Sequence, residues 1–472
     1  MSSQHRYSNS NGIGPIILTE GSPSLAASAR KGHQTERRVS KPQKMNYWRI
    51  ILSLFTLILF IGDLNSQNPG QRWQMYVDPA EAGWPKEKLQ AAKAFAEEMG
   101  SAAFLIVHDG KVVDYWGDIE RRFLCHSIRK SFLSGLMGVY VDQGIIDLST
   151  SLQELGIDDI QKLTSQEKQA TIADLLKARS GVYHPAAAET DIMAARRPER
   201  GSHPPGTFFY YNNWDFNALR HIIMLHSNKD FYQDFKERFA DPLQMEDFRL
   251  ADTHYFLEAD KSQFPAYTFR MSARDMARFG QLYLQEGMWN GEQIISREWV
   301  AESTQTYSYL DTVAKGPGYG YLWWTNMYGT KRTNYSARGL REHAIIIYPE
   351  ENVVLVNRVN TFMGNSVSKA DLTKWTEMIF AAKSGPAQTT AKITPLPHKL
   401  DQYSGPYVGI FGETVITRAG DRLLSNNNQG ARFYLYPVLG SEDIFFIEDL
   451  ELKVKFLRDE EGNLTGKTQV VY

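Results

Sequence analysis

The sequence predicts an α+β fold, in which an antiparallel sheet is flanked by helices, with an all-helical insert and a small C-terminal all-β domain. Three observations support this prediction. Hairpin patterns occur early, around Asp109-Gly110, and late, around residues 349–352. Between them, residues 150–270 are mostly typical of short helices and loops. Residues 403–472 alternate short β-like runs with turns.

Length and composition fit a globular protein with one large core or two cores. The 472 residues are 42% hydrophobic and carry a formal net charge of −2, which does not favour a nucleic-acid partner. Cys125 is the only cysteine, so the chain cannot form an intrachain disulfide or a thiolate metal cluster. The sequence contains no His-Glu-x-x-His, no Gly-rich phosphate loop and no Gly-x-Ser-x-Gly motif. We therefore predict no metal and no cofactor.

The first 66 residues are expected to lie outside the folded domains. Residues 1–44 are rich in Ser, Gly, Asn and Gln without apolar periodicity, which predicts disorder. The alternative is that translation starts at Met45 and that residues 1–44 are a mis-called extension. The apolar run at 50–61 is shorter than the ~20 residues of a membrane span. Residues 45–66 are therefore typical of a signal peptide, which predicts export to the periplasm or the extracellular space. The alternative is that 45–66 is retained as a membrane anchor.

Local patterns predict the elements of the main domain, residues 67–384, in order. Apolar residues at helical spacing predict a helix over 85–99, and Asp109-Gly110 between two apolar runs predicts a hairpin. Further along the chain we predict helices at 172–177, from about 213, at 271–285 and at 366–383, a buried strand at 320–324, and a hairpin of 343–348 with 353–359. A linker at 385–398 leads to the small β-rich domain, 399–472.

The first candidate site lies where a helix is expected to begin. Ser127 and Lys130 are three residues apart, so they share one helical face and can meet. A serine hydroxyl is a poor nucleophile until a neighbouring base takes its proton. To act as that base near neutral pH, the lysine pKa must fall by roughly 3 units, which burial can provide. The apolar residues that follow Phe132 indicate that this helix enters a core.

A second candidate site is predicted near the start of another helix. The Pro-Gly-Thr sequence at 205–207 forms a turn that leads into Tyr211-x-Asn213. Tyr211 and Asn213 are expected at the helix entrance, pointing into a cleft, with Asn213 able to cap the helix. Tyr210 and Asn212 also fit Tyr-x-Asn, but the spacing from the turn favours Tyr211.

Taken together, the motifs resemble the serine β-lactamase-like family, in the class C-like branch that includes penicillin-binding D-Ala peptidases, family VIII esterases and nylon-oligomer hydrolases. The resemblance covers about residues 68–384 and implies a β-lactamase/transpeptidase-like fold. The tail after residue 398 resembles a small β-barrel domain often appended to such hydrolases. The motifs are Ser127-x-x-Lys130, Pro205-Gly206-Thr207 with Tyr211-x-Asn213, Met271-Ser272-Ala273-Arg274-Asp275, and Gly320-Tyr321-Leu322-Trp323-Trp324.

The resemblance implies a role for each matched residue. Ser127 would be the acylated nucleophile, Lys130 its base or a proton relay, and Tyr211 the group that shuttles the proton to the leaving group. Lys130 and Tyr211 would titrate as a pair. Asn213 would hold Lys130 or a substrate carbonyl. The N–H of Ser127 would form half of an oxyanion hole.

The family's third motif, Lys-Thr-Gly or His-x-Gly, is matched best by Ser336-Ala337-Arg338-Gly339. Ala337 replaces the cation that helps hold a substrate carboxylate, which argues against β-lactamase and carboxypeptidase activity. Arg338 would substitute for this cation or form a surface ion pair. The N–H of Leu340 would complete the oxyanion hole, and His343 is expected to be structural.

These features predict an exported serine hydrolase. An ester or amide acylates Ser127 and water then releases the acid, with no metal or organic cofactor in either step. The expected substrate is a small molecule or a short peptide, and an esterase or amidase is favoured over a true β-lactamase. The alternative is a non-catalytic, penicillin-binding-like module that keeps the cleft for ligand recognition.

Overall fold

The structure is a computed structural model that describes residues 68–311, 316–329, 331–409, 412–427, 430–438 and 441–471. The predicted disorder at 1–44 and the predicted signal peptide or anchor at 45–66 lie outside the described residues. Within these residues, no helix is both long and apolar enough to cross a membrane.

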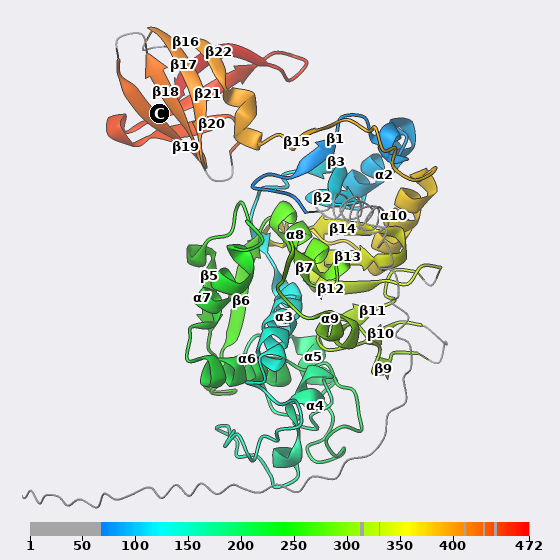
Figure 1. The fold of residues 1–472 in the computed structure, drawn as a ribbon. Helices are drawn as coiled ribbons and strands as arrows, with labels where there is room; N and C mark the ends of the chain where they lie inside the picture. The colour runs from blue at the N-terminus through cyan, green and yellow to red at the C-terminus, as the bar shows by residue number, and fades with distance from the viewer. Residues whose placement is uncertain are drawn as a thin grey trace, which may run out of the picture. The chain divides into compact units, whose positions relative to one another are not determined.

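A ten-stranded sheet forms the centre of the α+β fold (Figure 1). Its order is β15-β1-β3-β2-β14-β13-β12-β11-β10-β9, and its neighbours are antiparallel except for β1 with β3. The early hairpin β2–β3 and the late hairpin β13–β14 meet where β2 pairs with β14, which confirms the predicted fold class. The strands are β1 Gln74–Tyr76, β2 Ala103–His108, β3 Lys111–Gly117, β9 Ser308–Tyr309, β10 Gly318–Tyr319, β11 Trp324–Thr325, β12 Tyr335–Gly339, β13 His343–Tyr348, β14 Val353–Arg358 and β15 Ile393–Pro395.

The central strands are buried on both faces because helices cover both sides of the sheet. Helices α2 (Lys86–Glu98) and α10 (Lys369–Ala382) pack on one face, where Phe104 and Ile106 belong to their core. Leu105 and Val107 point the other way, into the core that contains α8 (Ala273–Leu284). This alternation explains why β2 is a continuous apolar run.

The predicted helical insert is present, and a small sheet lies at its C-terminal end. Strands β5 (Thr253–Phe256) and β6 (Ala266–Met271) pair with each other, and β6 also pairs with β4 (Phe123–Leu124), directly before the first candidate site. The helices are α3 Arg129–Asp142, α4 Ile172–Leu176, α5 Asp191–Ala195, α6 Asn213–Ser227 and α7 Phe231–Phe235.

The predicted buried strand at 320–324 is wrong. Strands β10 and β11 form a two-residue hairpin on either side of a tight connection, in which Leu322 takes a left-handed conformation with φ 64°. Trp323 is fully buried, and its ring centroid lies 4.5 Å from that of Tyr283 on α8. The run is apolar because the connection packs into the core, a pattern that resembles a buried strand in sequence.

The C-terminal residues form a closed barrel with its own core. Strand β15 lies within the predicted linker at 385–398, where it pairs with β1 at the edge of the central sheet. The barrel strands are β16 Gly405–Gly409, β17 Gly412–Ala419, β18 Arg422–Asn427, β19 Arg432–Pro437, β20 Ile444–Ile447, β21 Leu452–Arg458 and β22 Leu464–Val471.

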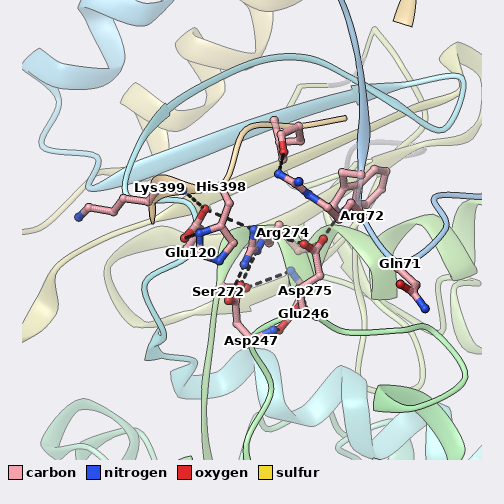
Figure 2. Close-up of polar contacts among 12 residues, drawn as sticks. Gln71, Arg72, Glu120, Glu246, Asp247, Ser272, Arg274, Asp275, His398 and Lys399 are labelled. Carbon is pink, nitrogen blue, oxygen red and sulfur yellow. Dashed lines mark hydrogen bonds and ion pairs between the residues drawn. The ribbon is translucent and has the colours of Figure 1, made fainter. Parts of the chain in front are cut away.

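The motif at residues 271–275 has a structural role. Ser272 caps α8 by accepting the N–H of Asp275 at 3.1 Å. Arg274 makes a bidentate pair with Asp247, at 2.6 and 2.7 Å, and Asp275 accepts the N–H groups of Glu246 and Asp247 (Figure 2). These contacts fix α8, which in turn supports the central strands.

Candidate active site

Ser127 stands at the entrance to a buried helix. It lies in a short 3₁₀ turn, η2 (His126–Ile128), which follows β4 and leads directly into α3. His126 adopts a left-handed conformation with φ 49°, which is costly for a non-glycine residue and bends the chain just before the nucleophile. Ser127 itself is only half-buried, so it remains accessible.

Lys130 meets Ser127 as the helical spacing predicts. Its Nζ lies 2.8 Å from Ser127 Oγ, and the residue is only 2% exposed. Burial lowers the pKa of the Lys130 amine well below its usual value, and the charge of Arg129 lowers it further. The described residues form no ion pair with Lys130, so a neutral amine can accept the serine proton.

Tyr211 is the third member of this group. It precedes α6, and Lys130 Nζ lies 4.9 Å from the centroid of its ring. Burial raises the pKa of Tyr211 to about 12, although a hydrogen bond with Ser127 acts in the opposite direction. The phenol is therefore protonated at neutral pH, and it lies close enough to Ser127 for that hydroxyl to lower its pKa.

The other tyrosine that fits the motif points elsewhere. Tyr210 donates its hydroxyl proton to the carbonyl oxygen of Met193 at 2.7 Å. Its ring packs edge-on against Tyr183 rather than beside Ser127. The structure thus places Tyr211, and not Tyr210, in the site.

Asn213, expected to hold Lys130 or a substrate carbonyl, makes no hydrogen bond with Lys130 in the described structure. Its Nδ2 donates to the carbonyl oxygen of Ala188 at 2.6 Å, and its buried Oδ1 has no hydrogen-bond partner among the described residues. The helix cap is instead Asn212, whose Oδ1 accepts the N–H of Trp214 at 2.7 Å. Asn213 is the first residue of α6, and this position turns its side chain toward the 187–188 segment.

The predicted oxyanion donors lie on adjacent backbone segments. A Cβ on Gly339 would lie 2.6 Å from the carbonyl oxygen of Cys125, so the end of β12 touches the chain just before Ser127. Leu340 follows Gly339 and opens the 3₁₀ turn η6 (Leu340–Glu342). The N–H groups of Ser127 and Leu340 therefore belong to two backbone segments that approach each other closely, as the two donors of an oxyanion hole must.

Arg338 is neither a free cation nor a surface residue. It forms an ion pair with Glu342, and its Nε donates to Tyr328 Oη at 3.0 Å. The side chains of this ion pair are only 16% and 12% exposed. Because a carboxylate already neutralises Arg338, and Ala337 is fully buried, neither residue offers an unpaired charge to a substrate carboxylate.

Two further residues beside the nucleophile were not predicted to take part. His126 Nε2 lies 2.9 Å from Thr361 Oγ1, and burial, aided by Arg358, lowers the pKa of His126 to about 4, so its ring is neutral. Arg129 is buried beside Lys130. The only signal for either residue in the sequence is its place in the motif around Ser127. His343, expected to be structural, is fully buried, and its Nδ1 accepts the N–H of Val359 at 3.4 Å.

The described residues contain no group of His, Cys, Asp and Glu side chains that could hold a metal ion. The site is therefore built from a hydroxyl, an amine and a phenol with two backbone N–H groups nearby. These groups can activate a serine, pass its proton to a leaving group and stabilise a developing negative charge.

The chain is similar to several known proteins. A family model described as Beta-lactamase matches residues 89–376. An uncharacterized protein of Alkalihalophilus pseudofirmus is 21% identical over 310 residues, which cover 56% of this chain and 85% of that protein. The octameric penicillin-binding protein homologue from Pyrococcus abyssi aligns with a TM-score of 0.46 and 17% identity over 79% of this chain and 96% of its own. A penicillin-binding protein homolog from Caulobacter crescentus aligns with a TM-score of 0.48 and 15% identity over 63% of this chain and 98% of its own.

Proposed function

The chain belongs to the beta-lactamase family, and on that premise we propose that it is a serine hydrolase that forms an acyl-enzyme on Ser127. The observation that carries this proposal is the contact of Lys130 Nζ with Ser127 Oγ at 2.8 Å, made by an amine whose pKa burial holds well below its usual value. A lysine that had to be deprotonated from its ordinary state near pH 7 would add on the order of 4 kcal/mol to the barrier. Burial of Lys130 removes much of that cost.

Ser127, Lys130 and Tyr211 each take part in acylation. Lys130 takes the proton of Ser127 as Oγ attacks the substrate carbonyl carbon, and the N–H groups of Ser127 and Leu340 stabilise the oxyanion. Tyr211 gives its phenol proton to the leaving group as the carbonyl–leaving group bond breaks, and it regains a proton from Lys130. A water molecule then attacks the acyl-enzyme and releases the acid, and its proton returns to Ser127 Oγ.

The charges around the site favour an uncharged ester or amide as the substrate. A β-lactam or a D-Ala peptide carries a carboxylate that needs a cation beside the cleft. Ala337 supplies none, and Arg338 is already paired with Glu342. We therefore propose esterase or amidase activity on small molecules or short peptides in preference to β-lactam hydrolysis.

Covalent labelling tests this function directly. Wild-type protein is incubated with a fluorophosphonate, and its intact mass is compared with that of Ser127→Ala; we expect an adduct on the wild type alone. Both proteins are then assayed with p-nitrophenyl esters, amides, D-Ala peptides and nitrocefin, and we expect turnover of the neutral esters or amides by the wild type. A folded wild type with no adduct and no turnover would instead favour the penicillin-binding-like recognition module.

We also propose that the enzyme acts outside the cytoplasm. The support comes from the sequence, in which the apolar run at 50–61 is followed by a polar segment that ends near Ser66. Expression of the full chain in a bacterial host should give an exported product whose intact mass corresponds to cleavage near Ser66. Recovery of uncleaved protein in the membrane fraction would favour the anchor, and recovery in the cytoplasm would contradict export.

A further inference from the structure

Arg129 is a buried cation without a carboxylate partner, and it lies between Ser127 and Lys130 in the chain. It is 4% exposed, and its guanidinium carbon lies 4.3 Å from the centroid of the Tyr267 ring. Its buried Nη1 has no hydrogen-bond partner, and the described residues form no ion pair with it. Among the other buried arginines, Arg274 and Arg278 pair with carboxylates. Arg358 donates to the carbonyl oxygens of Phe123 and Met271, and Arg220 to that of Pro265. Removal of an unpaired guanidinium from water is costly, and contact with an aromatic face recovers only part of that cost.

Lys130 receives no other uncompensated charge from the elements packed around it. Tyr211 and the ring of Phe216 face it from the start of α6, and both are uncharged. Across the site, His126 is neutral and Arg338 is neutralised by Glu342. No carboxylate acts on the Lys130 amine. Arg358, a second buried cation without a carboxylate partner, acts on His126 and His343 instead.

We propose that Arg129 holds Lys130 in its uncharged, proton-accepting form by placing an uncompensated positive charge next to it in the buried site. Two positive charges in a low-dielectric interior repel strongly, so the cheapest response is for the lysine to lose its proton. Arginine suits this role because its own proton is not lost under any ordinary condition. The Arg129 side chain acts through the Lys130 amine, so Arg129 is a positioning residue.

The pKa changes of Lys130 and Tyr211 agree with this role of Arg129. The pKa of Lys130 is lowered first by burial and then by Arg129, which is the only charged group that contributes to the shift. The pKa of Tyr211, which burial raises, is lowered in part by Ser127, by Arg129 and by Arg338. The same charge therefore makes the lysine a free base and makes the phenol a somewhat better acid.

The test compares a variant without the charge with one that keeps it. This inference rests on the proposed function, so the wild type is first shown to turn over a p-nitrophenyl ester and to form the Ser127 adduct. kcat/KM is then measured from pH 5 to 10 for wild type, Arg129→Met and Arg129→Lys. The acid limb of this profile reports the ionisation of the Lys130–Tyr211 pair in the free enzyme.

We expect Arg129→Met to move this limb to higher pH by roughly one unit. Its kcat/KM should fall about tenfold on the acid side and recover at high pH. Arg129→Lys should keep the limb close to that of the wild type. The rate of fluorophosphonate labelling of Ser127 should shift with pH in the same way, because it depends on the same base.

Several outcomes would overturn the inference. An unmoved limb in an active Arg129→Met would show that the charge does not control Lys130, and a loss that is equal at every pH would make Arg129 a structural residue only. Thermal unfolding is measured for each variant, and Arg129→Gln replaces Arg129→Met if the latter does not fold; failure of both to fold would also count against the proposal. An inactive, unlabelled wild type would contradict the proposed function itself, which distinguishes the two failures.

Discussion

At the scale of the residue, burial keeps both proton-carrying groups of the site uncharged. It lowers the pKa of the Lys130 amine and raises the pKa of the Tyr211 phenol to about 12. The same buried environment therefore leaves Lys130 deprotonated, as a base, and Tyr211 protonated, as an acid. When the surroundings lower the pKa of an amine and raise that of a phenol, the amine acts as the base and the phenol as the acid, and these roles are set before the substrate binds.

Replacement of Tyr211 by phenylalanine should separate the phenol's role in chemistry from its role in packing. The ring would still contact Phe216 and Trp324, whereas the proton donor for the leaving group would be lost. We expect kcat/KM to fall by roughly 10²- to 10⁴-fold, with little change in the free energy of unfolding. Steady-state kinetics and urea denaturation measure the two quantities.

Tyr210→Phe is the matched control. It removes one hydroxyl that donates to Met193, so it should cost about 1 kcal/mol of stability and leave kcat/KM unchanged. Equal losses of activity in both variants would contradict the assignment of Tyr211.

Sequence alone could place some of these residues and not others. The contact between Ser127 and Lys130 follows from helical geometry, so their spacing is enough to predict it. Asn212 and Asn213 are both suited to cap a helix, and only the entry angle of the chain decides which one does. The pairing of Arg338 with Glu342 depends on a sharp turn between them, in which Arg341 and Glu342 both have positive φ. No pattern in the sequence predicts that turn.

At the scale of the element, the end of β12 must approach η2 closely, and Gly339 permits this approach. Gly339→Ala would place a Cβ 2.6 Å from the backbone oxygen of Cys125, where no flexible side chain can give way. We expect the strand end to move away from Ser127, with a cost of about 1–3 kcal/mol in stability. The separation of the two oxyanion donors should lower kcat by roughly 10²- to 10³-fold.

Gly385→Ala provides the control for this variant. A Cβ there would meet no atom within 4 Å, and the backbone is not in the left-handed region. Its kinetics and unfolding midpoint should match those of the wild type. An active Gly339→Ala with an unchanged kcat would mean that the Leu340 N–H is not an oxyanion donor.

The cap of α6 should matter for catalysis as well as for stability, because Tyr211 immediately precedes it. Asn212 accepts the N–H groups of Trp214 and Asp215, and its Nδ2 donates to Val182. Asn212→Ala should cost about 1–2 kcal/mol in urea denaturation and reduce kcat, because the chain that carries Tyr211 is no longer held. Thr190→Ala removes the cap of the short, exposed helix α5 and should leave kcat unchanged. A fully active Asn212→Ala would show that the cap does not position the phenol.

The elements that could be predicted are those with strong local patterns. Strands β13 and β14 each have six residues that are mostly apolar, and a turn separates them. Helices α2, α8 and α10 show helical periodicity. Strands β9, β10 and β11 have only two residues each, which is too short for any period to appear. Their place at the sheet edge is decided by pairing between segments, in which β11 pairs with β12, β10 with β11 and β9 with β10.

At the scale of the whole molecule, a buried charge cluster around Arg274 joins segments that are far apart in the sequence (Figure 2). Arg274 pairs with Asp247 and also contacts Glu120, which follows β3. Glu120 in turn accepts the backbone N–H of Lys399 at 2.6 Å and lies 3.3 Å from His398 Nδ1. The described chain thus has a link between the main sheet and the segment that precedes the barrel, which local patterns in the sequence do not reveal.

Glu120 should make the stability of the protein depend on pH. Burial raises the pKa of Glu120 to about 7, and the attraction of Arg274 and the repulsion of Asp247 and Asp118 modify that effect. Because the pKa in the folded protein exceeds that of the unfolded chain, the stabilising contribution is fully present below the unfolded value of about 4.3 and is lost as pH rises through about 7. His398, whose pKa burial lowers to about 4, contributes with the opposite sign, because its stabilising effect develops as pH rises from about 4 to 6.5.

Glu120→Gln removes this titration and keeps an acceptor for the Lys399 N–H. Between pH 5 and 8, the free energy of unfolding of the wild type should decline relative to that of Glu120→Gln, by at most about 3 kcal/mol. The removal of one carboxylate near Arg274 should cost little by itself, since Asp247 still pairs with the guanidinium at 2.6 Å. Urea denaturation at each pH measures the difference, with Glu460→Gln, a change at an exposed carboxylate, as the control for net charge. Curves for wild type and Glu120→Gln that run parallel across this range would show that Glu120 remains ionised in the fold, held there by Arg274 and the Lys399 N–H.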